Sequence, residues 1–132
     1  MTQENKELLL KDLCARLPYK VKVQDTYYNS FEPNPIWLLD LNAQKVRLFA
    51  DEGYQSIEYI KPYLFPLSSM TDEQKEEFNT RSLELQLKVI DDEIMYEKAT
   101  EFEVDFYNKH HLDWRGLIPM GLALDATNLN IY

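Results

Sequence analysis

The sequence predicts an α+β fold: a small, largely antiparallel sheet packed by about three helices, in a single domain over residues 1–132. Near the N-terminus apolar residues recur every three or four positions, as in an amphipathic helix, and they then alternate as in a half-buried strand. Two later Thr-x-x-Gln/Glu patterns predict helix starts. A length of 132 residues suits one domain, and a hydrophobic fraction of 45% is enough for a core.

The first predicted element is an N-terminal amphipathic helix. Its apolar stripe consists of Leu9, Leu10, Leu13, Cys14 and Leu17, and its polar side of Lys6, Glu7, Lys11 and Asp12. Pro18 disfavours helical geometry in the residue before it, so the helix is expected to end near Leu17. The position of Cys14 on the stripe predicts a buried structural thiol rather than a nucleophile.

The following segments are typical of strands. Residues 19–25 alternate between apolar and polar positions, and residues 29–35, which contain two prolines, are expected to form a loop. Residues 36–41 and 45–50 bracket a short polar turn and predict a β-hairpin. Residues 57–67 are aromatic and twice interrupted by proline, which predicts an extended crossing that could also cover a homodimer interface.

The C-terminal half is predicted to hold two more helices. A capping box of Thr71 and Gln74 starts the first, which should run to about Arg81 with Phe78 as its anchor. Residues 83–89 alternate strictly and predict a strand, although their residue types favour helices, and residues 91–93 predict a turn. A second capping box at Thr100 predicts the start of the last helix, which ends at His110 and His111.

Residues 110–116 are the strongest candidate for chemistry. In an enzyme, His110 or His111 would act as general acid or base, Asp113 would orient it, and Arg115 would hold an anionic group. The structural alternative explains these side chains equally well. In it the histidines cap helix carbonyls, Asp113 caps the next turn, Trp114 is core, and Arg115 pairs with a surface acid.

The residue inventory argues against a metal or cofactor. Structural zinc needs four Cys or His ligands, whereas this chain has two adjacent histidines and the distant Cys14. Adjacent helical side chains point about 100° apart, which leaves only a carboxylate-assisted site with Asp113 conceivable. Serine-nucleophile motifs and phosphate-cradling glycine loops are absent from the sequence. We therefore predict no cofactor and no metal.

The charge is strongly acidic and uneven. The formal net charge is −9, and residues 66–132 carry 14 acids against 6 Lys and Arg. This excess disfavours direct binding to nucleic acid and to anionic membranes. It forms either a solvated surface or a face that docks a basic partner protein, by charge pairing or by imitating DNA. The candidate face comprises Glu76, Glu77, Asp91 and Asp92.

Three further features of the sequence indicate the cellular compartment. The N-terminus lacks the basic and apolar regions of a signal peptide, and no segment is long and apolar enough to span a bilayer. The single cysteine fits a reducing interior. We therefore expect a cytoplasmic protein.

Two blocks carry a resemblance to a known group of proteins. Residues 61–71 (KPYLFPLSSMT) and 110–124 (HHLDWRGLIPMGLAL) are similar to recurring blocks in a family of uncharacterised small proteins of gut bacteria and their phages or prophages. The family pattern has arginine at Phe65, an aromatic residue at Leu112 and tyrosine at Trp114, and the first departure removes a charge. The resemblance implies a phage-associated or mobile-element accessory protein, and it supplies no activity, cofactor or catalytic residue to carry over. We expect a non-enzymatic interaction protein, with a small His/Asp/Arg enzyme as the alternative.

Overall fold

The computed structural model describes residues 1–28, 32–48, 53–87 and 93–132, which contain three α-helices and one six-stranded sheet. The helices are α1 (Gln3–Arg16), α2 (Asp72–Leu87) and α3 (Glu93–Lys109). The strands are β1 (Lys22–Asp25), β2 (Asn34–Asp40), β3 (Lys45–Leu48), β4 (Tyr54–Ser56), β5 (Ile60–Leu64) and β6 (Leu124–Asp125). Their order is β4-β3-β2-β1-β5-β6, and every pair except β5–β6 is antiparallel. The predicted α+β fold class is confirmed.

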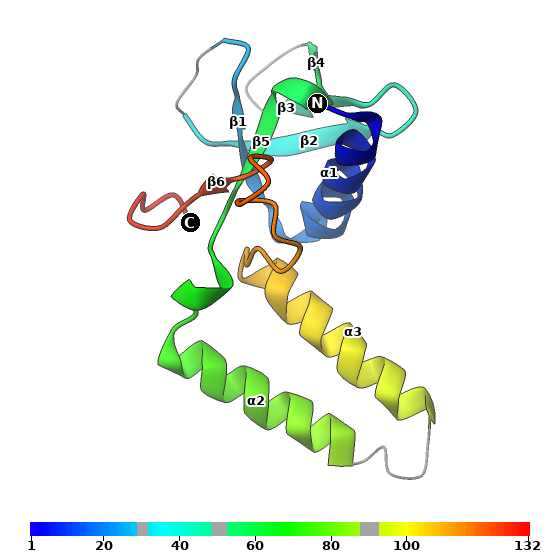
Figure 1. The fold of residues 1–132 in the computed structure, drawn as a ribbon, viewed down its shortest axis with the longest axis vertical. Helices are drawn as coiled ribbons and strands as arrows, with labels where there is room; N and C mark the ends of the chain where they lie inside the picture. Colours follow the sequence, from blue (N-terminus) through cyan, green and yellow to red (C-terminus); the bar gives the residue numbers. More distant parts are fainter. Residues whose placement is uncertain (29–31, 49–52, 88–92) are drawn as a thin grey trace.

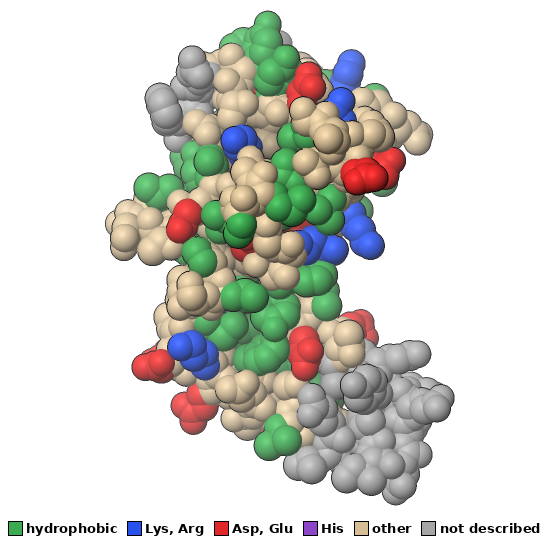
Figure 2. Space-filling view, in the orientation of Figure 1, with side chains coloured by type: hydrophobic (Ala, Val, Ile, Leu, Met, Phe, Trp, Pro, Cys, Tyr) green, Lys and Arg blue, Asp and Glu red, His purple; other side chains and the backbone are tan. Residues whose placement is uncertain are grey.

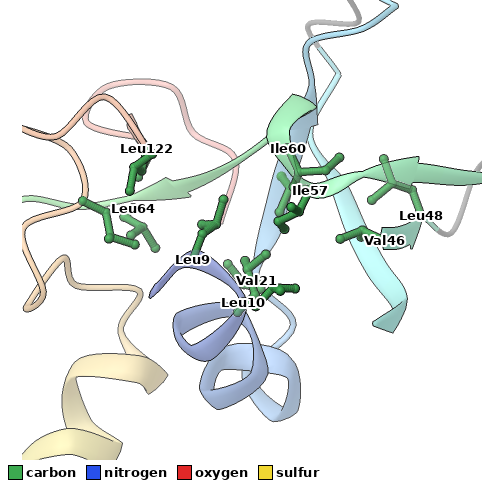
Figure 3. Packing of buried hydrophobic residues seen from close by; sticks show 13 residues of the cluster. Leu9, Leu10, Val21, Val46, Leu48, Ile57, Ile60, Leu64 and Leu122 are labelled. Carbon is green, nitrogen blue, oxygen red and sulfur yellow. The ribbon is translucent and has the colours of Figure 1, made fainter. Parts of the chain in front are cut away.

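Helix α1 packs its apolar side on one face of the sheet. The Thr2 hydroxyl accepts a hydrogen bond from the Asn5 amide at 3.1 Å and so caps its first turn. Leu9 and Leu10 meet side chains from the strands in the core (Figure 3). Two predictions for this helix are wrong: Cys14 is exposed, and Asp12 is fully buried. The apolar stripe is narrower than predicted and rotated toward Asp12.

The sheet follows the sequence pattern closely. Val21 and Val23 are buried at alternate positions, and β2 and β3 form the predicted hairpin. The predicted loop over residues 29–35 is too long, because β2 begins at Asn34 and includes Pro35. Pro35 lies near the start of its strand, where the missing amide donor costs least. The predicted extended crossing over residues 57–67 is confirmed only for β5, which lies between β1 and β6, because Ile57–Tyr59 form a 3-10 helix and a second one begins at Leu67.

Helices α2 and α3 pack along each other and project away from the sheet as a two-helix arm (Figure 1). Phe78 is the predicted anchor: its ring centroid lies 5.3 Å from that of Phe106 and 5.2 Å from that of Tyr107. Apolar side chains gather in the space between the two helices (Figure 2). The capping box is confirmed, because the Gln74 amide donates to the Thr71 hydroxyl at 3.1 Å and the Thr71 amide to Gln74 Oε1 at 3.0 Å.

Two secondary-structure predictions in the arm are wrong. Residues 83–87 continue α2 instead of forming a strand, and there Leu85 is 8% exposed whereas Leu83 is 56% exposed. In a strand these two side chains would share a face, so the helix-forming residue types outweigh the alternation. Helix α3 begins at Glu93, so Thr100 lies inside it rather than at its start. No glycine or proline in residues 93–99 would stop the helix there.

Part of the segment between α2 and α3 lies outside the described residues. Of the predicted turn at 91–93 only Glu93 is described, so the candidate face residues Asp91 and Asp92 are not. Across the described part of the chain, no helix is long and apolar enough to cross a membrane.

Candidate functional site

The run after α3 begins with a tight helix ending. His111 has a φ of +57°, its amide donates to the Asn108 carbonyl at 3.2 Å, and the Leu112 amide donates to the Tyr107 carbonyl at 2.8 Å. This pair of bonds is a Schellman motif, in which the left-handed position is usually glycine. A histidine there is strained, so its side-chain contacts must help to hold it.

The His111 ring is held by stacking. Its centroid lies 3.7 Å from that of Tyr132, and the two planes are inclined by 16°. Tyr132 is fixed in turn, because its hydroxyl donates to the Tyr63 carbonyl at 2.8 Å and accepts from the Lys22 amide at 2.8 Å. Burial, followed by the nearby positive charge of Arg16, lowers the pKa of His111 to about 4. The imidazole is therefore neutral near pH 7.

His110 faces a different environment. Its Nδ1 lies 3.3 Å from Gln74 Nε2, and its ring centroid is 4.4 Å from that of Phe106. With Phe65 and Gln74 it lines a pocket of about 250 Å³ where the arm joins the sheet. Burial lowers the pKa of His110, and the carboxylate of Glu77 partly opposes this shift. The two histidines thus diverge, as their adjacency predicts.

Asp113 has the role given by the structural alternative. Its Oδ1 accepts the Leu117 amide at 2.7 Å, and its Oδ2 accepts the Ile118 amide at 2.8 Å. Both oxygens of the buried carboxylate are thus occupied by the turn that it caps. Trp114 is only half-buried, and its Nε1 donates to Asn108 Oδ1 at 3.0 Å. The structural alternative predicts Trp114 in the core, and this part of it is wrong.

Arg115 belongs to a charge cluster around the fully buried Asp12, so the surface acid that the structural alternative expects as its partner is wrong. Its Nε donates to Asp12 Oδ1 at 3.2 Å, and Arg16 Nε donates to Asp12 Oδ2 at 2.8 Å. Arg16 Nη2 also donates to the Leu112 carbonyl at 2.7 Å, so the cluster ties α1 to the residue 110–116 run. Asp12 and Arg16 are both fully buried. The spacing of four between Asp12 and Arg16, beside Leu9 and Leu13, is the signal that could have indicated this pair.

The proposed catalytic side chains do not share one cleft. His110 lines the pocket at the base of the arm, the His111 ring stacks on Tyr132, and Arg115 lines a separate groove beside α1. The Asp113 carboxylate is bonded to backbone amides rather than to an imidazole. Within the described residues, no three His, Cys, Asp or Glu side chains are grouped closely enough to hold a metal ion. This geometry gives no support to acid–base chemistry through His111, Asp113 and Arg115.

The acidic candidate face lies on the arm. Glu76 and Glu77 are exposed on α2, and they line a shallow depression of about 440 Å³. Glu73 and Glu84 extend the same surface, which we call the α2 acidic face, and among the described residues that line it Arg81 is the one cation. Arg81 Nη1 pairs with Glu84 Oε2 at 3.3 Å. Acidic side chains are visible along the outer edge of the molecule where α2 begins (Figure 2).

Fold and surface together define an α+β protein with a two-helix arm that carries an acidic face, and with buried ion pairs that tie α1 to the residue 110–116 run. No protein-family model, curated protein or solved structure matches this chain. Its function must therefore be argued from its own side chains.

Proposed function

We propose that this chain is a non-enzymatic interaction protein that acts in the cytoplasm and docks a basic partner protein through the α2 acidic face. The single observation that carries the proposal is the lining of that face, where four glutamates surround one arginine. A phage or prophage origin, which the resemblance of the two sequence blocks implies, is part of the same proposal.

The position of the face supports docking. Helix α2 uses one side to pack on α3, and the glutamates occupy an exposed side of a projecting arm. A partner can approach such a surface without displacing any part of the core. Exposed charges of one sign steer a complementary partner and set its orientation, and they contribute less to raw affinity.

The sign of the charge selects the class of partner. Four carboxylates repel the phosphates of nucleic acids and of anionic lipids, so a surface rich in Lys and Arg is the complementary one. Because these pairs would be exposed to solvent, the association is expected to weaken as salt rises.

The test compares two variants of equal net charge. One replaces Glu73, Glu76 and Glu77 by Gln, and the other replaces the exposed acids Glu4, Glu32 and Glu58 by Gln. Both variants change the formal net charge from −9 to −6. Each is used with the parent chain to recover partners from host lysate, with quantitative mass spectrometry at low and high salt.

The proposal expects a basic protein that the parent and the second variant recover equally and that the α2 variant loses. Its recovery should also fall with salt. Unchanged recovery by the α2 variant would exclude the acidic face as the docking surface. Equal loss by both variants would show that only the overall charge matters, and this too would overturn the proposal.

A further inference from the structure

A groove of about 610 Å³ runs between α1 and the tip of the β2–β3 hairpin, and Arg115 contributes to its lining. The hairpin tip lies beside α1 in the ribbon view (Figure 1). Three segments distant in sequence thus build one hollow. Its volume lies in the range of about 300–1,000 Å³ that is usual for small-molecule sites. It lies apart from the α2 acidic face.

The lining of this α1 groove is apolar with cations at its margin. Cys14, Ala15 and Leu41 supply most of the apolar surface, since Leu41 is 55% exposed and Leu10, which also lines the groove, is only 5% exposed. Lys11 and Arg115 supply positive charge, against the single carboxylate of Glu7. The lining of the groove therefore carries a net positive charge, whereas the whole chain has a net charge of −9.

Arg115 is held in place before any ligand arrives. Its Nε is bonded to Asp12, and its guanidinium carbon lies 4.1 Å from the centroid of the Trp114 ring. The Asp12 carboxylate is shared with Arg16, so one negative charge faces two guanidinium groups. This leaves the buried cluster with an excess positive charge next to the groove, which a second anion would balance.

We propose that the α1 groove binds a small amphipathic carboxylate, with its apolar body on Leu10, Ala15 and Leu41 and its carboxylate between Arg115 and Lys11. A fixed guanidinium suits a carboxylate because its planar fork can donate two parallel hydrogen bonds. The apolar lining supplies the affinity that an exposed ion pair alone would lack. This site is independent of the proposed protein partner.

Cys14 provides a built-in reporter for the test. It is the only cysteine of the chain, it is exposed, and it lines the groove. Its alkylation rate by neutral iodoacetamide is measured with increasing decanoate. Acetate tests the carboxylate without a long alkyl chain, and decylamine tests a long alkyl chain that carries a positive charge instead. We expect saturable slowing by decanoate and none by acetate or decylamine at equal concentration.

Variants separate the charge from the shape. Arg115→Met should weaken decanoate protection at least about tenfold, and Lys11→Met about 2- to 5-fold, since the second charge is more exposed. Lys45→Met, which removes an exposed lysine outside the groove lining, is the matched control and should leave protection unchanged. Ala15→Trp should fill the groove without a charge change, so it tests the site even where Arg115→Met fails to fold.

The proposal would be overturned by an absence of saturable protection by decanoate, by equal protection by decylamine, or by equal weakening in the Lys11 and Lys45 variants. Protection that survives Ala15→Trp would likewise place the ligand elsewhere.

Discussion

The body and the arm of this molecule use charged residues in opposite ways. In the body, Asp12 and Arg16 are fully buried and paired at 2.8 Å, and Arg115 completes the cluster. In the arm, the glutamates of α2 are exposed, and the one described ion pair among them, Arg81–Glu84, is more than half exposed on both sides. Charged residues therefore hold the fold together in the body, whereas in the arm they form an exposed surface.

The difference shows how each region is stabilised. Removing one member of a buried pair leaves an uncompensated charge, whereas removing an exposed acid changes stability little. The arm is held instead by an aromatic cluster around Phe78, which stacks on Tyr107 and contacts Phe102 and Phe106. Substitutions in the two regions should therefore differ in how much unfolding free energy they cost and in how far the destabilisation spreads through the structure.

The largest effect is expected for Asp12→Ala. It leaves the buried Arg16 without its carboxylate and should cost about 3–5 kcal/mol of unfolding free energy. Chemical denaturation monitored by circular dichroism measures this loss. Lys11→Ala, at the neighbouring exposed position of α1, should stay within about 0.5 kcal/mol. Equal losses for the two variants would show that the buried cluster does not hold the body together.

A smaller and more local effect is expected for Phe78→Ala. The half-buried ring should cost about 2–3 kcal/mol, somewhat less than a fully buried phenylalanine. Hydrogen exchange should show faster amides in α2 and α3 with unchanged protection in β1 and β5. Leu83→Ala, on the exposed side of the same helix, is the control and should leave the hydrogen-exchange rates of these amides unchanged. Loss of protection in the sheet as well would show that the arm and the body unfold together.

How far the sequence predicts the structure differs between the same two regions. In the body, the alternation of apolar and polar residues predicts the buried positions of Val21 and Val23, and the two prolines in residues 57–67 predict the extended segment that contains β5. Both signals are local, because each depends only on neighbouring residues in the chain. The contact between Asp12 and Arg115 could not be predicted, because the two residues lie 103 positions apart. Such a contact depends on the tertiary fold, so residue types alone place Asp12 on the polar side.

In the arm, local signals were partly misleading. The capping box at Thr71 marked a helix start, but the same pattern at Thr100 lies inside α3. A Thr-x-x-Glu spacing also places two side chains on one helix face, so it does not by itself define an end. For the candidate site, the capping role of Asp113 was predictable, but the separation of the histidines from Arg115 in different pockets was not.

A third test uses pH and concerns His111 at the edge of the body. Its pKa is about 4 in the folded chain, lowered by burial and by Arg16, His110 and Lys22, against 6.5 ordinarily. The unfolded chain therefore binds more protons between these values, and stability should fall as pH decreases from 6.5 to 4. After allowance for partial exposure, the loss should be about 1–2 kcal/mol.

Comparison with His111→Asn isolates this contribution from that of the carboxylates. Asparagine tolerates the left-handed backbone and does not titrate, so the variant should lose less stability over the same pH range. Identical slopes for the two chains in urea denaturation at several pH values would contradict the buried neutral imidazole.

The smallest expected effect is that of Thr71→Ala at the start of the arm. The substitution removes the hydroxyl that accepts the Gln74 amide and should cost about 1 kcal/mol. Because Gln74 Nε2 also lies 3.3 Å from His110 Nδ1, the loss should spread to the pocket at the base of the arm. NMR shifts of the first turn of α2 and of His110 should therefore move together, with those of α1 unchanged.

Thr71→Ser keeps the hydroxyl and should retain most of the stability. If only the α2 amides shift, the arm is capped independently of the residue 110–116 run, and the two regions are less coupled than the Gln74 contact implies.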